Sequence, residues 1–117
     1  MLSLLPSSKI FLVVGPTDMR RSFNGLAATV EYEVESDPLS GQVFVFCNRR
    51  RDRVKLLWWD GTGLWVAAKR LERGTFAWPE IGTPSVEMGP HEVSLLLGGI
   101  DLKDTRPRRW YRRAAEG

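Results

Sequence analysis

The feature that most constrains this chain is a run of short β-type segments between residues 43 and 79. Each segment is rich in β-branched and aromatic residues, and turn-forming residues separate it from the next. The segments are "VFVFC" at 43–47, "VKLLWW" at 54–59, "LWVAAKRL" at 64–71 and "TFAWP" at 75–79. Connections this short favour antiparallel neighbours, so the spacing predicts a β-meander.

The connections inside this run carry their own signals. "NRRRD" at 48–52 has the length of a hairpin connection, and its arginines should project from the tip. Asp60-Gly61 favours a type I′ turn, which needs a positive φ at both central positions. "VFVFC" is apolar on both faces, which predicts a central strand, and Pro79 should end the last strand because proline lacks the ladder donor.

Other elements flank the meander. "KIFLVV" at 9–14 predicts a further buried strand. A helix capped by Thr17 or Asp18 should follow, because apolar residues then recur at helical spacing for three to four turns. These apolar residues are Phe23, Leu26, Val30 and Val34. Gly25 inside this helix indicates a close approach to the sheet.

The C-terminal part predicts less structure. Residues 80–90 read as irregular, and "HEVSLLLGG" predicts a short helix that stops at Gly98-Gly99. We therefore predict an α+β fold, with an antiparallel β-meander of four to five strands, one amphipathic helix packed on it and a short C-terminal helix. Residues 1–104 should form a single domain, and residues 105–117 a basic, flexible tail.

Composition excludes several classes of protein. A chain of 117 residues suits one core, and its 43% hydrophobic and 26% charged residues are typical of a globular domain. The longest apolar runs fall far short of the roughly 20 residues that span a bilayer, and no signal peptide is evident. Cys47 is the only cysteine, so no intrachain disulfide can form. We expect a cytoplasmic protein without membrane contact.

The positive charge is unevenly distributed. Residues 1–48 carry a net charge of −2, whereas residues 49–117 carry +5. Two basic clusters account for this asymmetry, and they consist of Arg49, Arg50, Arg51, Arg53 and Lys55, and of Arg106, Arg108, Arg109, Arg112 and Arg113. Such clusters favour a polyanionic partner, because guanidinium groups neutralise phosphates. In the tail, Trp110 and Tyr111 between the arginines could also stack on bases.

Simpler interpretations stand beside this hypothesis. Exposed arginines at a turn can be merely solvated and keep a hairpin soluble. A basic tail can be disordered without any ligand. Trp58, Trp59, Trp65 and Trp78 could form a stacking platform, but alternation places Trp58 and Trp59 on opposite faces, so core packing is favoured.

An enzymatic interpretation finds little support. The aspartates sit in turns or caps that explain them locally, and His91 is the only histidine. "GPTDMR" lacks the spacing of a P-loop, and one cysteine cannot build a thiolate metal site. We therefore expect no catalytic residues, no metal and no cofactor.

Three stretches together resemble a known family. "VVGPTDMRRSFNGLA", "SGQVFVFCNRRRDRVKLLWWDGTGLWV" and "KRLERGTFAWP" resemble the accessory protein encoded by the second open reading frame of bacterial insertion sequence 66 transposons. The resemblance covers about residues 8 to 80. Its motif positions are Thr17, Asp18, Met19, Arg20, Asn48, Arg49, Arg50, Asp52, Arg53, Trp59, Asp60, Gly61, Lys69, Arg70, Leu71 and Glu72. Ser22 and Ala67-Ala68 depart from the family's usual residues.

The resemblance implies a role in transposition beside a larger transposase that carries the metal-dependent chemistry. We expect a non-catalytic accessory protein that binds DNA near the transposon ends through the two basic clusters. The alternative is an adaptor that docks on the transposase through Lys69, Arg70, Glu72 and Arg73 without binding DNA. The sequence leaves the oligomeric state open, although an edge strand can pair with a second copy.

Overall fold

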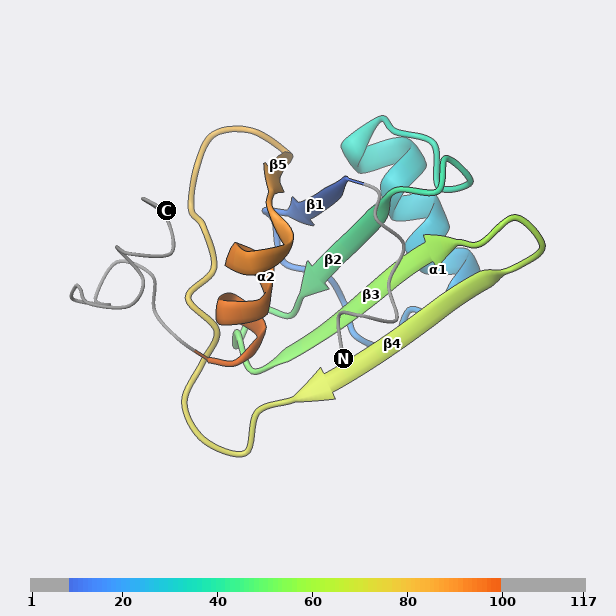
Figure 1. Ribbon diagram of the computed structural model, residues 1–117. Coiled ribbons are helices and arrows are strands. Elements are labelled where there is room, and N and C mark those ends of the chain that lie inside the picture. The colour runs from blue at the N-terminus through green and yellow to red at the C-terminus, as the bar shows by residue number, and fades with distance from the viewer. Residues whose placement is uncertain (1–8, 100–117) are drawn as a thin grey trace.

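A computed structural model describes residues 9–99, which form a five-stranded sheet with two helical segments (Figure 1). The strands are β1 (Ile10–Val13), β2 (Val43–Cys47), β3 (Arg53–Trp59), β4 (Leu64–Arg70) and β5 (Ser85–Met88). Their order across the sheet is β4-β3-β2-β1-β5. β1 runs parallel to β2, and the other neighbours are antiparallel. The predicted α+β class is confirmed, although the parallel pair makes the sheet mixed.

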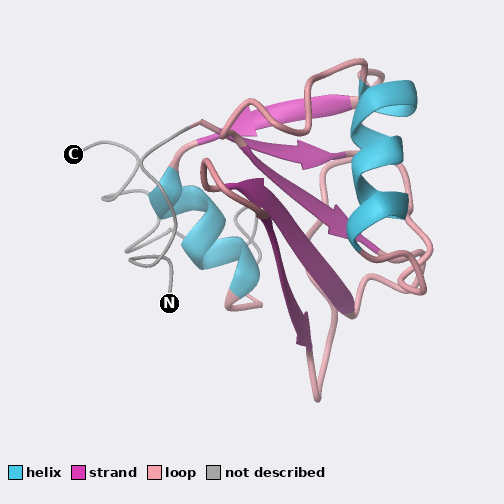
Figure 2. Ribbon diagram, turned by 90° about the vertical axis from the view of Figure 1, so that its right-hand side faces the viewer, coloured by secondary structure: helices cyan, strands magenta, loops and turns pink. Residues whose placement is uncertain are grey.

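Both predicted helices are present, and they lie on opposite faces of the sheet (Figure 2). α1 (Phe23–Thr29) continues as a π-helical turn, η2 (Val30–Val34), which ends at Glu35 with a φ of 59°. α2 (Pro90–Leu97) ends at Gly98, as its sequence predicts. None of the described helices is long and apolar enough to cross a membrane.

The central strand β2 is buried on both faces, as predicted. Because side chains alternate along a strand, Phe44 and Phe46 pack beneath α1 and η2, whereas Val43, Val45 and Cys47 face α2. Burial on both sides makes β2 the rigid centre from which the adjacent loops project.

Two of the four tryptophans in the described part of the chain belong to the core. Trp58 and Trp78 are buried on the α2 side, and the indole N–H of Trp78 donates a 2.9 Å hydrogen bond to the Val13 carbonyl oxygen. Trp65 stacks on Trp58 at a centroid distance of 5.9 Å but remains 54% exposed. Core packing is therefore confirmed for Trp58 and Trp78.

Two predictions about the strands are wrong. "TFAWP" forms no strand, although its alternation is real, because it buries Phe76 and Trp78 against the α2 face of the sheet. The Phe76 amide donates to the Arg51 carbonyl oxygen over 2.7 Å, which ties this segment to the β2–β3 hairpin. The edge strand β5 falls instead within residues 80–90, which were predicted to be irregular.

Several local predictions also need correction. The β3–β4 turn spans four residues, since the Asp60 amide donates to Gly63, and only Gly61 has a positive φ (105°) there. A Cβ on Gly25 would lie 3.0 Å from the Cβ of Arg21, so this glycine accommodates Arg21 and not the sheet. Phe23 is 47% exposed.

The predicted helix cap is also wrong. The carboxylate of Asp18 accepts the Arg20 amide in the loop ahead of α1, and Thr17 is buried. Ser22 occupies the capping position of α1 without a side-chain hydrogen bond.

Candidate nucleic-acid interface

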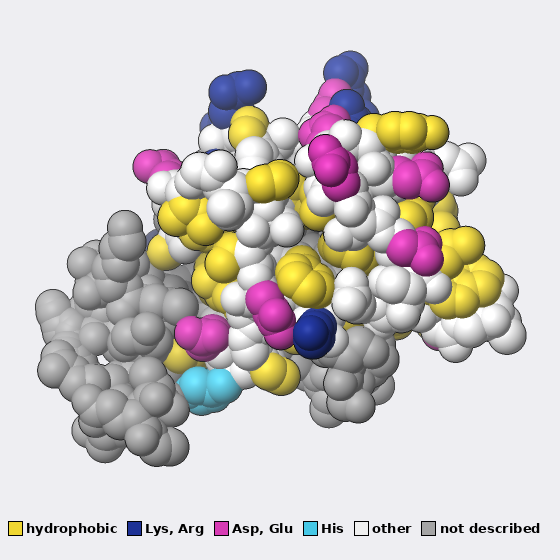
Figure 3. Space-filling model, turned by 90° about the horizontal axis from the view of Figure 1, so that it is seen from above, with side chains coloured by type: hydrophobic (Ala, Val, Ile, Leu, Met, Phe, Trp, Pro, Cys, Tyr) yellow, Lys and Arg dark blue, Asp and Glu magenta, His cyan; other side chains and the backbone are white. Residues whose placement is uncertain are grey.

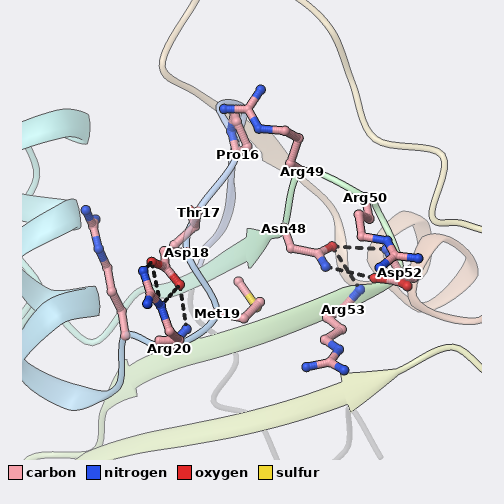
Figure 4. A pocket seen from close by; sticks show the side chains of 11 residues that line it. Pro16, Thr17, Asp18, Met19, Arg20, Asn48, Arg49, Arg50, Asp52 and Arg53 are labelled. Atoms are coloured by element: carbon pink, nitrogen blue, oxygen red, sulfur yellow. Dashed lines mark hydrogen bonds and ion pairs between the residues drawn. The ribbon is translucent and has the colours of Figure 1, made fainter.

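Two segments that are distant in sequence meet at one end of the sheet. Because β1 and β2 are parallel, the loop that follows β1 and the hairpin that follows β2 leave the same edge. The Thr17 amide joins them by donating a 2.8 Å hydrogen bond to the Cys47 carbonyl oxygen. Between them lies a groove of about 690 Å³, shown in Figure 4. Its lining includes Arg20, Arg21, Arg49, Arg50 and Arg53.

A second groove of about 440 Å³ adjoins the first, because Met19 and Arg53 line both. It continues along the ends of β3 and β4, where Lys55, Lys69, Arg70 and Glu72 contribute to its walls. Three separate stretches of sequence therefore build one continuous, strongly basic surface, which we call the arginine groove.

The hairpin tip is held by the side chain of Asn48. Its Oδ1 accepts hydrogen bonds from the amides of Asp52 (3.0 Å) and Arg53 (3.1 Å), and its Nδ2 donates to Asp52 Oδ1 over 2.8 Å. The last of these bonds lowers the pKa of the Asp52 carboxyl, and the nearby Arg50 and Arg53 act in the same direction. A neutral amide thus shapes the turn, and the arginines are free to point elsewhere.

The hairpin arginines differ from the others in their pairing. Within residues 9–99, Arg49, Arg50 and Arg53 form no ion pair. The remaining arginines of the groove are paired, as Arg20 with Asp18 (2.7 Å), Arg21 with Glu33 (3.5 Å) and Arg70 with Glu72 (3.2 Å). Unneutralised charge is therefore concentrated on the β2–β3 hairpin.

The carboxylate of Asp18 is bonded to Arg20. Its carboxylate accepts hydrogen bonds from the side chain and amide of Arg20, and these bonds hold the pKa of Asp18 at about 2. It therefore stays ionised at neutral pH and fixes the guanidinium of Arg20 at the groove wall (Figure 4).

Arg51 faces the opposite way, so the expectation that every hairpin arginine projects from the tip is wrong for this residue. Its Cζ lies 5.9 Å from the ring centroid of Trp78, and its Nη1 is buried without a hydrogen-bond partner in the described part of the chain. Its φ of 62° permits this reversal of direction. Arg51 thus anchors the hairpin to the core.

The chain's only cysteine lies beneath this hairpin. Burial raises the pKa of the Cys47 thiol to about 11, and the nearby Arg51 only partly opposes that effect. The thiol is therefore protonated at neutral pH, which makes Cys47 a core residue and a poor nucleophile.

Comparison with known proteins assigns the chain to a family. The family model described as IS66 Orf2-like protein matches residues 8–107. This chain belongs to the IS66 Orf2-like family. Family membership makes it a transposition-associated accessory protein, and the family is not a known catalytic one.

Two relatives of this IS66 Orf2-like protein come from Sinorhizobium fredii (strain NBRC 101917 / NGR234). The uncharacterized protein y4jC is 40% identical over 101 residues, which cover 86% of this chain and 85% of the relative. The uncharacterized protein y4hO is 38% identical over 103 residues, which cover 86% and 90%. No solved structure matches the chain.

The remaining predicted site residues of the IS66 Orf2-like protein do not all belong to the arginine groove. The ammonium group of Lys55 donates to the Arg21 carbonyl oxygen, and that of Lys69 to the Leu97 carbonyl oxygen at the end of α2, both over 2.8 Å. Arg73 is exposed and lines neither part of the arginine groove. The predicted tail residues Arg106, Arg108, Arg109, Arg112 and Arg113 lie outside the described residues.

Arg20 and Arg21 complete the groove, but sequence reasoning did not assign them to the basic surface. The signal that could have found them is the parallel placement of β1 and β2, which no local pattern reveals.

Among residues 9–99, no group of three or more His, Cys, Asp or Glu side chains could hold a metal ion. On the face seen in Figure 3, Asp and Glu lie scattered, and Lys and Arg are mostly confined to one margin.

Proposed function

We propose that this IS66 Orf2-like protein assists transposition by binding duplex DNA near the ends of the element through the arginine groove. The observation that supports this most strongly is a set of arginines, Arg49, Arg50 and Arg53, that form no ion pair within residues 9–99 and lie on a rigid hairpin beside the groove. Phosphates can therefore replace water around these guanidinium groups without first breaking ion pairs.

The lining of the groove favours a duplex over a single strand. Neither part of the arginine groove is lined by an aromatic side chain in the described chain. Single-strand binders typically combine basic grooves with aromatic rings on which bases stack. Contacts to phosphates position a protein on DNA without reading its sequence. The role we propose is thus to hold DNA for a larger transposase of the same element, which performs the chemistry.

The test is fluorescence anisotropy of a labelled duplex titrated with the full chain at several salt concentrations. Arg49→Ala with Arg50→Ala should weaken binding at least tenfold at low salt. It should also make the slope of log affinity against log salt shallower by about 1.8, at about 0.9 for each lost phosphate contact.

Lys9→Ala is the matched control, because Lys9 is exposed beside the opposite end of β1 and lines neither part of the groove. It should leave both the affinity and the slope unchanged. A wild-type protein that shows no salt-sensitive binding to DNA at low ionic strength would contradict the proposal.

A protein-docking adaptor is the second candidate, and the exposure of Trp65 favours it, since exposed tryptophans often anchor protein interfaces. In this role, Trp65 together with Lys69, Arg70, Glu72 and Arg73 would contact the transposase. An adaptor would co-purify with the transposase and lose that association on Trp65→Ala, whereas DNA would have no effect. Anisotropy and co-purification together therefore separate the two candidates.

A further inference from the structure

β4 forms one edge of the sheet. Two hydrogen bonds show which of its residues direct their backbone N–H and C=O groups away from β3. The Asp60 amide donates to Gly63 (3.0 Å), and the Leu71 amide donates to Asp52 (2.8 Å), at the two ends of the β3–β4 ladder. Hydrogen-bonded and non-bonded pairs alternate in an antiparallel ladder. The residues of β4 that direct their N–H and C=O groups away from β3 are therefore Leu64, Val66, Ala68 and Arg70.

The other edge of the sheet is protected, and β4 is not. β5 has only four residues and follows Pro84 directly. Because the Val14 amide donates to the Pro84 carbonyl oxygen, the alternation of the ladder directs the backbone N–H and C=O groups of the exposed Glu87 away from β1. Short length, proline and charge are the usual devices against edge pairing. β4 has seven residues, no proline, and a charge only at its final residues. No strand within residues 9–99 pairs with its outer edge, so β4 is a template for another strand.

We propose that β4 pairs with β4 of a second copy of this chain, antiparallel about a two-fold axis at Ala67. In this register Val66 faces the partner's Ala68, and Leu64 faces the partner's Arg70. Trp65 faces the partner's Lys69, whose aliphatic stem can cover the exposed indole.

The self-complementarity of β4 supports a second copy as the occupant. No like charges meet in this register, and all of the outward N–H and C=O groups find partners. A register centred two residues later would oppose Lys69 with the partner's Lys69, which is unfavourable. The interface is small, so we expect a monomer–dimer equilibrium and not a permanent dimer.

The proposed β4–β4 pairing also determines where the arginine grooves of the two copies lie relative to each other. A two-fold axis between antiparallel strands is perpendicular to the sheet, so the α1 faces of both copies lie on the same side. Lys55, Ala68 and Arg70, which line part of the groove, point to that side, since Leu57 of the same β3 face packs beneath α1. One duplex could then contact both grooves. This consequence rests on the proposed function, whereas the pairing itself does not.

Sedimentation equilibrium of the full chain without DNA tests the pairing. Ala68→Pro removes an outward N–H and places a ring in the path of the partner strand, but it leaves the bonds to β3 intact. Glu87→Pro is the matched control, because it makes the same change at an outward position of β5. We expect a mass that rises toward the dimer with concentration for the wild type and Glu87→Pro, and a monomer for Ala68→Pro.

A wild-type chain that stays monomeric at several hundred micromolar would overturn the pairing. So would an Ala68→Pro variant that remains folded by circular dichroism and dimerises as the wild type does. A monomer that binds the transposase through Trp65 would also overturn it and would favour the docking role.

Disulfide trapping gives a second test that does not depend on a proline. Ala67 faces its own counterpart across the axis, so Ala67→Cys should form a covalent dimer under mild oxidation. Ala68→Cys faces the partner's Val66 and should cross-link much less, and the buried Cys47 of the wild type should not cross-link. Equal cross-linking of the two variants would contradict this register. Both tests omit DNA, so their outcome is independent of the anisotropy measurements.

Discussion

Strand β3 carries a hairpin at each end. In both turns a side-chain oxygen accepts two backbone N–H groups, but the two turns suit different roles. At residues 48–52, the side-chain oxygen Oδ1 of Asn48 accepts hydrogen bonds from two backbone N–H groups. At residues 60–63, Asp60 Oδ1 accepts the amides of Thr62 and Gly63, each over 2.9 Å, and its Oδ2 accepts the indole N–H of Trp65 over 2.8 Å.

The difference between the two turns lies in the charge of the residue that holds them. The carboxylate of Asp60 is satisfied inside its own turn, and the residues around it are uncharged. Asn48 is neutral, so it fixes the backbone without neutralising Arg49 or Arg50, and Asp52, the one carboxylate in this turn, bonds to Asn48 and forms no ion pair in the described part of the chain. A rigid tip with free positive charge suits contact with a polyanion, whereas the other tip suits packing.

The largest expected effect comes from reversing charge at one tip. Arg49→Glu with Arg50→Glu should weaken duplex binding by roughly 100-fold or more at low salt, because attraction to phosphates becomes repulsion. Thr62→Glu adds a negative charge to the exposed tip at the other end of β3, and it should change the affinity less than about threefold. Anisotropy with the same duplex measures both. The first variant changes the net charge by −4 and the second by −1, so a loss from Thr62→Glu above about a quarter of the first loss in binding free energy would contradict a special role for the arginine tip.

The next effect is on stability. Asn48→Ala removes the acceptor for two amides and the donor to Asp52, so it should lower the free energy of unfolding by about 1–3 kcal/mol. It should also weaken DNA binding severalfold, because the hairpin arginines lose their fixed positions. Urea denaturation and anisotropy measure the two effects. Ser40→Ala, in the exposed loop before β2, is the control and should change both far less, because it removes only long hydrogen bonds to Gln42 (3.3 and 3.4 Å).

Local patterns in the sequence predicted most of the fold. The β-branched and aromatic residues of "VFVFC", "VKLLWW" and "LWVAAKRL", with turn residues between these segments, correctly placed β2, β3 and β4, and helical spacing correctly placed α1. Local patterns could not show which face or edge a segment joins. "TFAWP" has a strand's alternation but buries two rings over the sheet, whereas "SVEM" forms the edge strand β5 with few strand-like features.

The candidate site was predictable in part for the same reason. The charge cluster at Arg49, Arg50 and Arg53 is visible in the sequence, and so is its hairpin. The contribution of Arg20 and Arg21 depends on the parallel pairing of β1 with β2, which is a long-range contact. The inward direction of Arg51 depends on Trp78, which lies 27 positions later in the chain.

A smaller effect should appear in acid. Backbone hydrogen bonds from Thr62 and Gly63, together with the indole N–H of Trp65, hold the pKa of Asp60 at about 2, below its ordinary value of 3.8. Its stabilising contribution is therefore complete above about pH 4 and is lost as the pH falls toward 2. Asp60→Asn should lower the melting temperature at pH 7 and make its fall between pH 4 and 2 shallower. An unchanged acid profile would contradict this account of the turn.

The smallest expected change in DNA binding tests the contrast between neighbours within one tip. Arg50 lines the groove, but Arg51 packs over Trp78, so Arg51→Ala should change duplex affinity less than about twofold. The same substitution should cost about 1 kcal/mol of stability, because a cation–π contact is lost. It should also alter the tryptophan fluorescence, since Trp78 loses its covering charge. If Arg51→Ala weakened binding as much as Arg50→Ala does, all the hairpin arginines would act as one diffuse charge, and their directions would have no role.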